Sequence, residues 1–289
     1  MLDKQEIKNQ NFDAERALYG LHGAEVKSCT FAGPADGESA LKETGDIRVV
    51  DCHFELRYPL WHVQGFALEN SDMTETARAA LWYAENGEIK NCRLGGIKAL
   101  RECQRVNLSG VEAVSEEFGW KCRDIQVTDS DITSSYVFLD SRDLTLTDSK
   151  IKSKYSFQYV ENTEIEHCEL DTKDAFWHSR NVTVRNSIIK GEYLGWYSEN
   201  LTLINCRIIG TQPLCYCKGL KLVDCTMEGC DLSFERSEVE AEVRGSVDSI
   251  KNPVSGRITA DSVGEIIREE SVPQTAEIII RDEQERLGA

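Results

Sequence analysis

The sequence lacks the features of a membrane protein and of a nucleic-acid-binding protein. It contains no run of about 20 apolar residues, so no membrane-spanning helix is expected. Basic residues are in the minority: 33 Lys and Arg stand against 50 Asp and Glu, a formal net charge of −17. Because phosphates and anionic lipids attract cations, this balance argues against nucleic acid and membrane surfaces as partners.

Other missing features bear on location and organisation. The first residues, Met1-Leu2-Asp3-Lys4-Gln5, lack the charged and then apolar pattern of a secretory signal, so a cytoplasmic location is expected. No linker rich in Ser, Gly or Pro interrupts the chain, and residues 1–289 are therefore expected to form one domain. No paired C-x-x-C spacing suits zinc, and neither a metal nor a cofactor is expected.

A repeat of about 19 residues runs through most of the sequence. Each unit holds a period-2 apolar run, then a bend residue, then Cys or Ser in most units, then an apolar residue two positions later. The bend residues recur at steps of 19, 21 and then 19: Asp51, Asn70, Asn91, Gly110, Asp129, Asp148, His167, Asn186, Asn205 and Asp224. A second bend precedes each run, at Asn86, Asp124, Asp143, Asn162, Asn181, Asn200 and Gly219. Period 2 predicts strands, and Asx and Gly tolerate the left-handed backbone of a sharp bend.

A unit this short cannot fold alone, but stacked on its neighbours it forms one coil of a parallel β-helix. Equivalent residues then lie roughly 4.8 Å apart. The leucine-rich repeat has a similar period, but it requires a leucine-asparagine consensus that is missing here. The sequence predicts an all-β fold with regular coils over 24–247, irregular coils over 248–280 and a loose tail over 281–289.

The eleven cysteines fall into the repeat. Cys29, Cys52, Cys92, Cys168, Cys206 and Cys225 share one position with serines, and Cys103, Cys122 and Cys217 share another. Small residues that alternate with thiols predict free, buried ladders of small side chains. The alternative is a redox pair between neighbouring coils, such as Cys103 with Cys122 or Cys206 with Cys225.

One sheet face is predicted to be functional. Alternation along the strand before the second bend predicts an outward column of Glu43, His62, Tyr83, Glu102, Lys121, Asp140, Tyr159, His178, Tyr197 and Tyr216. It also predicts an outward column of Leu41, Leu60, Leu81, Leu100, Gly119, Phe138, Phe157, Phe176, Gly195 and Leu214. The five tryptophans lie between them and are predicted to point inward. If the strand is bulged there, the tryptophans face outward and the Leu/Phe column faces inward.

An exposed aromatic strip is unusual for a monomer, and it has three interpretations. The first is a surface that binds an elongated ligand such as a saccharide, through Lys121, Arg123, Arg142, Arg180, Tyr159, Phe157, Phe176 and Tyr197. The second is a carbohydrate-active enzyme that uses Glu102, Asp140 and His178, with the two acids roughly 9.6 Å apart. The third is a self-association patch in a homo-oligomer. Against all three stands a simple charge ladder that stabilises a solvated face.

Two coils contain longer loops. Residues 32–37 extend one coil and residues 74–77 extend another. Both loops lead into the strand that bears the aromatic residues. They are expected either to wall one end of a groove over Glu43, His62 and Tyr83 or to be neutral insertions.

Several segments resemble a known family: Leu81-Trp82-Tyr83, Gly96-Ile97-Lys98-Ala99-Leu100-Arg101-Glu102-Cys103, Glu117-Phe118-Gly119-Trp120-Lys121-Cys122, Asp174-Ala175-Phe176-Trp177-His178-Ser179 and Gly195-Trp196-Tyr197-Ser198-Glu199-Asn200. They resemble an uncharacterised bacterial domain-of-unknown-function family of single-stranded, right-handed parallel β-helices. The resemblance covers nearly the whole chain and implies the fold and its handedness, but no activity or catalytic residues. At the level of fold it extends to pectin-lyase-like proteins, from which function does not follow.

Overall fold

The computed structural model describes residues 5–34, 37–273 and 275–281, and the elements found there are parallel β-strands. The chain divides into two compact units, residues 1–152 and 153–289, and each is described by itself. The boundary falls within β19 (Lys150–Ser156). No helix in the described residues is long and apolar enough to cross a membrane.

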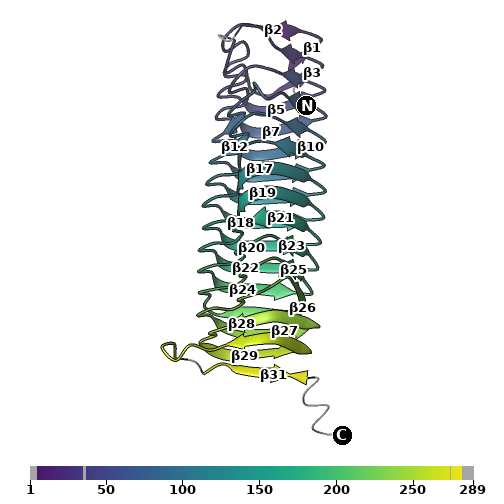
Figure 1. Ribbon diagram of the computed structural model, residues 1–289. Helices are drawn as coiled ribbons and strands as arrows, with labels where there is room; N and C mark the ends of the chain where they lie inside the picture. The colour runs from purple at the N-terminus through teal and green to yellow at the C-terminus, as the bar shows by residue number, and fades with distance from the viewer. Residues whose placement is uncertain (1–4, 35–36, 274, 282–289) are drawn as a thin grey trace. The chain divides into compact units, whose positions relative to one another are not determined.

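The first unit is a parallel β-solenoid. Its principal strands stack in the order β1 (Gln5–Lys8), β3 (Ala24–Lys27), β5 (Gly45–Val50), β7 (Gln64–Glu69), β10 (Glu85–Lys90), β13 (Gln104–Ser109), β16 (Arg123–Thr128) and β18 (Arg142–Thr147) (Figure 1). Val106 pairs with Ile125 and Ile125 with Leu144, which confirms the predicted 19-residue coil. Val26 pairs with Val49 and Leu68 with Ile89, so the two predicted loops lengthen their coils without disturbing the pairing.

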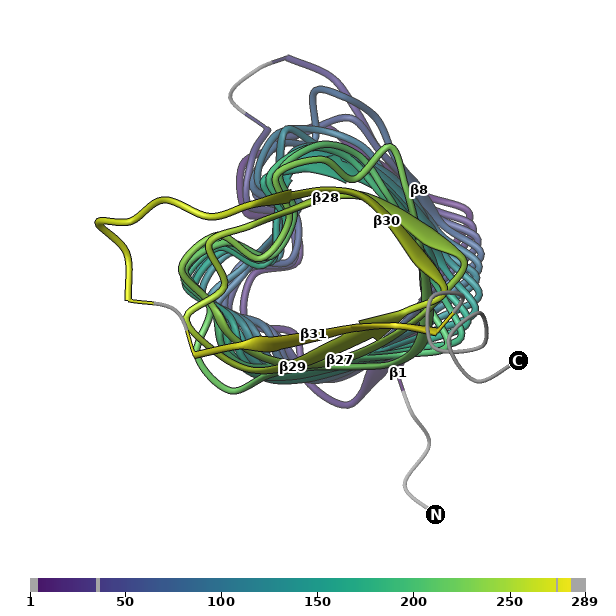
Figure 2. The same cartoon turned by 60° about the horizontal axis from the view of Figure 1, so that its bottom comes forward.

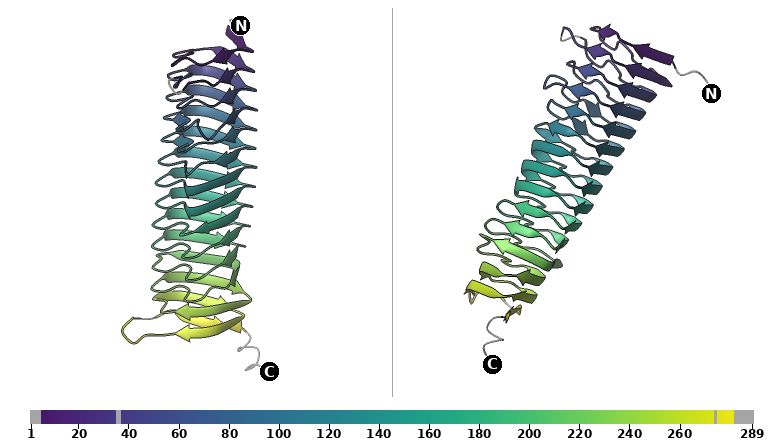
Figure 3. Two further views of the ribbon diagram at one scale, coloured as in Figure 1. Left: turned by 45° about the horizontal axis from the view of Figure 1, so that its top comes forward. Right: turned by 90° about the vertical axis from the view of Figure 1, so that its right-hand side faces the viewer.

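Shorter strands complete the coils of the first unit. One row is β2 (Asn11–Phe12), β4 (Thr30–Phe31), β6 (His53–Phe54), β8 (Asp72–Met73), β11 (Arg93–Leu94), β14 (Glu112–Val114) and β17 (Asp131–Val137). A second row is β9 (Leu81–Trp82), β12 (Leu100–Arg101) and β15 (Glu117–Phe118). Figure 3 shows the strands of each unit lying above their counterparts in the next coil.

The second unit is also a parallel β-solenoid. One wall is formed by β20 (Glu161–Glu166), β22 (Arg180–Arg185), β24 (Glu199–Ile204), β26 (Leu220–Glu228), β27 (Glu238–Arg244), β29 (Ser255–Ala260) and β31 (Glu277–Ile280). Another contains β21 (Glu169–Lys173), β23 (Ile188–Lys190) and β25 (Arg207–Ile209). At the C-terminal end β28 (Ser246–Lys251) pairs with β30 (Ser262–Ile267), opposite β27, β29 and β31 (Figure 2). The register shifts between Leu222 and Cys225, and later coils are less regular.

The bends have the left-handed backbone that the sequence predicts. All ten residues of the first bend have positive φ, for example 48° at Asp129 and 52° at Asn186. So do all seven predicted residues of the second bend, including Asp124 at 53° and Asn162 at 54°. Asx residues therefore recur because each coil needs a residue that tolerates positive φ at the same two places.

The thiols form structural ladders inside both units. All eleven are buried and free, so the predicted core role is confirmed and no disulfide pair forms. Several of the buried Cys and Ser side chains accept a hydrogen bond from a backbone N–H of the preceding coil. Cys103 N–H donates to Cys122 Sγ (3.4 Å), and Cys122 N–H donates to Ser141 Oγ (2.9 Å). A thiol or hydroxyl is retained here because an apolar residue would leave a buried N–H without an acceptor.

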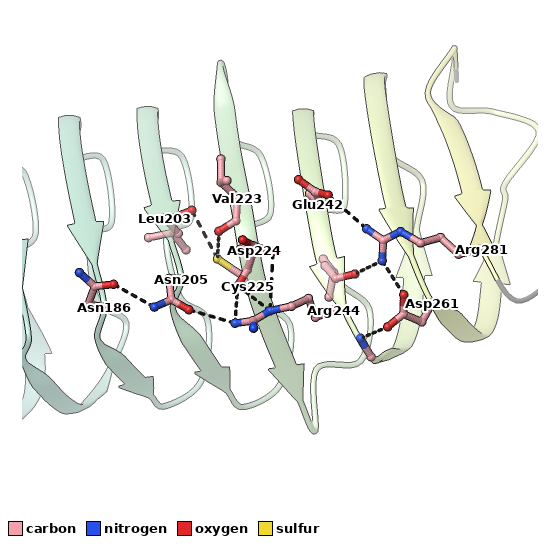
Figure 4. Close-up of polar contacts among 12 residues, drawn as sticks. Asn186, Leu203, Asn205, Val223, Asp224, Cys225, Glu242, Arg244, Asp261 and Arg281 are labelled. Atoms are coloured by element: carbon pink, nitrogen blue, oxygen red, sulfur yellow. Dashed lines mark hydrogen bonds and ion pairs between the residues drawn. The ribbon is translucent and has the colours of Figure 1, made fainter.

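Polar side chains also link the exposed bends of the second unit (Figure 4). Asn205 Nδ2 donates to Asn186 Oδ1 (2.9 Å), and Arg244 Nη2 donates to Asn205 Oδ1 (2.9 Å). Nearer the C-terminus, Arg281 donates to the carbonyl of Val243 (3.0 Å) and contacts Asp261 (2.5 Å). These contacts satisfy polar groups at the rim of the irregular coils.

Candidate functional site

The main aromatic feature of the second unit is a ring ladder, which we define as Tyr159, His178, Tyr197 and Tyr216. Successive centroids are 5.0, 5.0 and 4.8 Å apart, and successive planes differ by only 11°, 8° and 11°. Tyr159 is 53% exposed and Tyr197 is 42% exposed. The predicted outward orientation of these side chains is therefore confirmed.

A second row of rings lies beside the ring ladder. Trp177 and Trp196 are half-buried and stack at 5.5 Å with an interplanar angle of 5°. Each indole N–H donates to a backbone carbonyl in the next coil, Trp177 to Tyr193 and Trp196 to Gln212, both at 2.7 Å. The indoles are thus fixed by hydrogen bonds as well as by stacking, and they support the ring ladder from one side.

The prediction that the Leu/Phe column faces solvent is wrong. Phe157 and Phe176 are fully buried and stack on one another at 5.3 Å, so neither is available to a ligand. For the same reason, an exposed Phe strip cannot be the contact of a self-association patch. Leu41, Leu60, Leu81, Leu100, Phe138 and Leu214 are buried as well.

The cause is a turn where the sequence pattern predicts a strand. Phe176 has φ 60° and His178 has φ 53°, and Ser179 N–H donates to the Phe176 carbonyl at 3.2 Å. Two left-handed residues so close together break the period-2 alternation, which places the Phe side chain inward and the Trp side chain partly outward. The alternative orientation of the tryptophans is therefore the correct one, although the irregularity is a turn and not a bulge.

Charged groups flank the ring ladder of the second unit. Arg180 Nε lies 3.4 Å from Glu199, and Lys173 Nζ lies 3.0 Å from Glu192. Asp174 was not singled out as a site residue from the sequence, yet it is 7% exposed and its Oδ1 has no hydrogen-bond partner. Burial raises the pKa of Asp174 above the ordinary range of aspartate. No sequence signal distinguishes this aspartate from the exposed ones, because its burial follows from the turn.

In the first unit, Glu102, Lys121 and Asp140 occupy one column in successive coils. Glu102 N–H donates to the Trp120 carbonyl, and Lys121 N–H donates to the Leu139 carbonyl. Glu102 accepts a hydrogen bond from Trp82 Nε1 at 3.3 Å. His178 belongs to the other unit, and the catalytic roles predicted for Glu102, Asp140 and His178 stay predictions.

The guanidinium groups predicted to bind a ligand are exposed. Arg123 Nε lies 3.5 Å from Asp143, and Arg142 is aligned with Arg123 in the neighbouring coil. Arg101, which occupies the position of a tryptophan in its coil, lies between the rings of Trp82 and Trp120, 5.0 and 5.2 Å from their centroids. Its Nη1 also forms a 3.1 Å ion pair with Glu117. This contact explains how a cation is accommodated in the tryptophan column.

The first unit also has hollows in its surface. One measures about 630 Å³ and is lined by His22, Glu43, Thr44, His62, Gln64, Tyr83 and Glu85. It contains the three residues over which the sequence predicts a groove. Smaller hollows lie beside Asp72 (about 280 Å³) and Asp131 (about 460 Å³). Among the described residues, no group of three or more His, Cys, Asp or Glu side chains is arranged to hold a metal ion.

Known structures share the β-helical architecture at low identity. A surface adhesin of Streptococcus pneumoniae, PfbA, is 9% identical over 73% of this chain and 71% of its own, with a TM-score of 0.40. The periplasmic alginate epimerase AlgG, as a double mutant, is 11% identical over 89% and 77%, with a TM-score of 0.35. Tailspike protein 3 of bacteriophage CBA120 is 12% identical over 95% and 51%, with a TM-score of 0.36. At these values no ligand or activity is carried over to this chain.

Comparison with curated protein sequences gives no match. The family model DUF3737, described as a protein of unknown function, matches residues 5–281. Because this match spans nearly the whole chain, the chain belongs to the DUF3737 family.

Proposed function

We propose that the second unit binds an elongated saccharide along the ring ladder. The observation that carries this proposal is the unbroken row of four rings in register, Tyr159, His178, Tyr197 and Tyr216, spaced by 4.8–5.0 Å. A row in which each coil contributes one aromatic ring suits a ligand that is itself built of repeating units. Backbone hydrogen bonds between coils, from Tyr159 N–H to the Trp177 carbonyl and from His178 N–H to the Trp196 carbonyl, also hold the array in place before binding, which reduces the entropy lost on association.

The exposed parts of the ladder match the chemistry of a sugar. Parallel rings at this spacing are offset, so each presents an edge and part of a face to solvent. Tyrosine hydroxyls and the imidazole offer hydrogen bonds, while the exposed ring carbons and the neighbouring Trp177 and Trp196 offer apolar contact. Aromatic side chains with few rotatable bonds lose little conformational entropy on binding.

The charges favour a neutral saccharide over a uronate. Arg180 already contacts Glu199 at 3.4 Å, and Lys173 contacts Glu192 at 3.0 Å. A carboxylate ligand would have to compete with these glutamates for the cations, in a chain with a net charge of −17. Binding a uronate through a bidentate arginine contact would therefore require these ion pairs to rearrange, whereas binding a neutral sugar would not.

Affinity gel electrophoresis against a panel of neutral polysaccharides tests the proposal. We expect at least one polysaccharide to retard the protein, and Tyr197→Ala to weaken that binding about tenfold, equivalent to about 1.4 kcal/mol. Tyr19→Ala is the control, because Tyr19 is an exposed tyrosine, at 53%, that belongs to the first unit and not to the ring ladder. Absence of retardation by every polysaccharide, or equal effects of the two variants, contradicts the proposal.

A further inference from the structure

The 630 Å³ hollow of the first unit has the size of a small-molecule site, for which about 300–1,000 Å³ is typical. Its lining comes from successive coils that are held in register. His22 bridges to Gly45, Gly45 pairs with Gln64, and Gln64 pairs with Glu85. The backbone of His22, Gln64 and Glu85 is therefore held by strand pairing, and Glu43, His62 and Tyr83 lie on the turns that adjoin these strands.

A glycine makes room for one of these side chains. A Cβ added to Gly45 would lie 2.6 Å from His22 Nδ1 and 2.8 Å from its Cε1. Only glycine lets the imidazole of His22 rest against this strand. The second imidazole, of His62, is oriented by Glu43 through a 3.0 Å contact at Nδ1 and meets the Tyr83 ring edge-on at 4.9 Å.

The hollow has unused hydrogen-bonding capacity. In the part of the chain that the structure describes, the side chains of His22, Gln64 and Tyr83 form no hydrogen bonds with other residues, and the contact of His62 with Glu43 uses Nδ1 and not Nε2. Imidazole, amide and phenol groups offer both donors and acceptors. Several such groups converging on one concave surface suit a ligand with multiple hydroxyl or amino groups.

The charge of the lining determines which sign of ligand fits. Glu43 and Glu85 line the hollow, and no described lysine or arginine does. Glu85 is compensated from outside by Arg105, 2.7 Å away, whereas Glu43 faces only the histidine His62. When that imidazole is neutral, the lining carries an excess negative charge. An anionic ligand is repelled and a monovalent cation is attracted.

We propose that this hollow binds a small amino polyol, such as an amino sugar, with its ammonium group at Glu43. The hydroxyl groups of the ligand reach His22, Gln64 and His62, and the Tyr83 ring, 40% exposed, contacts the carbon chain or the ammonium group. The site uses residues of the first unit alone, so it is independent of saccharide binding along the ring ladder.

Three probes that share one carbon chain test the proposal by isothermal titration calorimetry at pH 7.5. They are glucamine, which carries an ammonium group, sorbitol, which is neutral, and gluconate, which carries a carboxylate. We expect glucamine to bind about tenfold or more tightly than sorbitol, and gluconate not to bind. Glu43→Gln removes the glucamine preference, whereas Glu88→Gln, which changes an exposed glutamate on β10 outside the hollow, leaves it unchanged.

Equal affinity for glucamine and sorbitol overturns the proposal, as does absence of glucamine binding or full binding by Glu43→Gln. If Glu43→Gln unfolds, Tyr83→Ala provides a second variant at an exposed lining residue, and it is expected to weaken glucamine binding by a similar factor. Polysaccharide retardation that persists in Glu43→Gln and is lost in Tyr197→Ala separates the two sites. A failure at one therefore does not count against the other.

Discussion

The two units carry different side chains at the equivalent turn of their coils. In the first unit, the column after the buried Leu/Phe position contains Lys42, Trp61, Trp82, Arg101 and Trp120, with Lys42 Nζ 4.7 Å from the Trp61 ring and Arg101 between two indoles. In the second unit, the equivalent column is Gln158, Trp177 and Trp196, and the two indoles stack directly. Two cations thus pack against indoles in the first unit, where Trp61 and Trp82 also stack at 5.5 Å, whereas Gln158, Trp177 and Trp196 of the second unit include no cation.

This difference shows that buried residues determine the backbone of the turn, whereas the exposed side chains vary independently of it. Asp140 in the first unit and His178 in the second both have φ 53°, although one is an acid and the other an aromatic ring. The buried columns hold the turn, so the exposed columns are free to vary. The exposed side chains of the two units can therefore differ while the fold stays the same.

The largest expected effect concerns the buried Leu/Phe column, which the two units share. Phe138→Ala in the first unit and Phe176→Ala in the second should each lower the free energy of unfolding by about 3–5 kcal/mol, because both side chains are fully buried. Chemical denaturation followed by tryptophan fluorescence measures the loss. A loss below about 1 kcal/mol at either position would show that the ring is not in the core.

The next effect should distinguish the units. Arg101→Ala removes the cation between Trp82 and Trp120 and leaves Glu117 with only the more distant Lys98, 3.9 Å away, and we expect a loss of about 2–3 kcal/mol. Gln158→Ala at the equivalent place in the second unit should cost less than about 1 kcal/mol, because only one hydrogen bond to a carbonyl is lost. Similar losses for the two variants, measured by urea denaturation, would refute the distinction.

The third prediction concerns pH and the second unit alone. The folded state raises the pKa of Asp174, so the protonated form is favoured and the stabilisation it gives is lost as pH rises through the folded-state pKa. Asp174→Asn should therefore increase the free energy of unfolding by about 1 kcal/mol at pH 7. The gain should vanish below about pH 4, where the carboxyl is protonated in both states. Asp171→Asn, at an exposed residue of β21, is the control and should show no such pH dependence.

The smallest expected effect is common to both units. Cys122→Ser and Cys217→Ser should change stability by less than about 1 kcal/mol, because serine already accepts the same backbone hydrogen bond elsewhere in the ladders. Cys122→Ala should cost about 1–3 kcal/mol, since the N–H of Cys103 loses its acceptor. Thermal melts of the three variants test the ranking, and a Ser variant less stable than the Ala variant would contradict it.

The sequence predicts the coils well because the bends impose a local requirement that recurs every 19 residues. The orientation predicted for the Leu/Phe column is wrong, because the chain turns there and period-2 alternation does not continue through a turn. Gly119 and Gly195 occupy the Phe column with φ 73°, and glycine there was the available signal that this position is left-handed. Arg101 was a second signal, because an unpaired guanidinium is not tolerated inside a core. The burial of Asp174 and the hollow around His22 depend on contacts between coils, which spacing along the chain does not encode.

The ladders of buried hydroxyls and thiols have a consequence for editing the chain. Many coils offer the neighbouring coil a hydroxyl or thiol acceptor at the same position, so the junctions between such coils resemble one another. Excising residues 182–200 from the second unit would join Asn181 to Leu201, which reproduces the native junction Asn200–Leu201. The shortened protein retains a native junction but lacks Trp196 and Tyr197, so the number of stacked rings in the second unit becomes a quantity that can be designed.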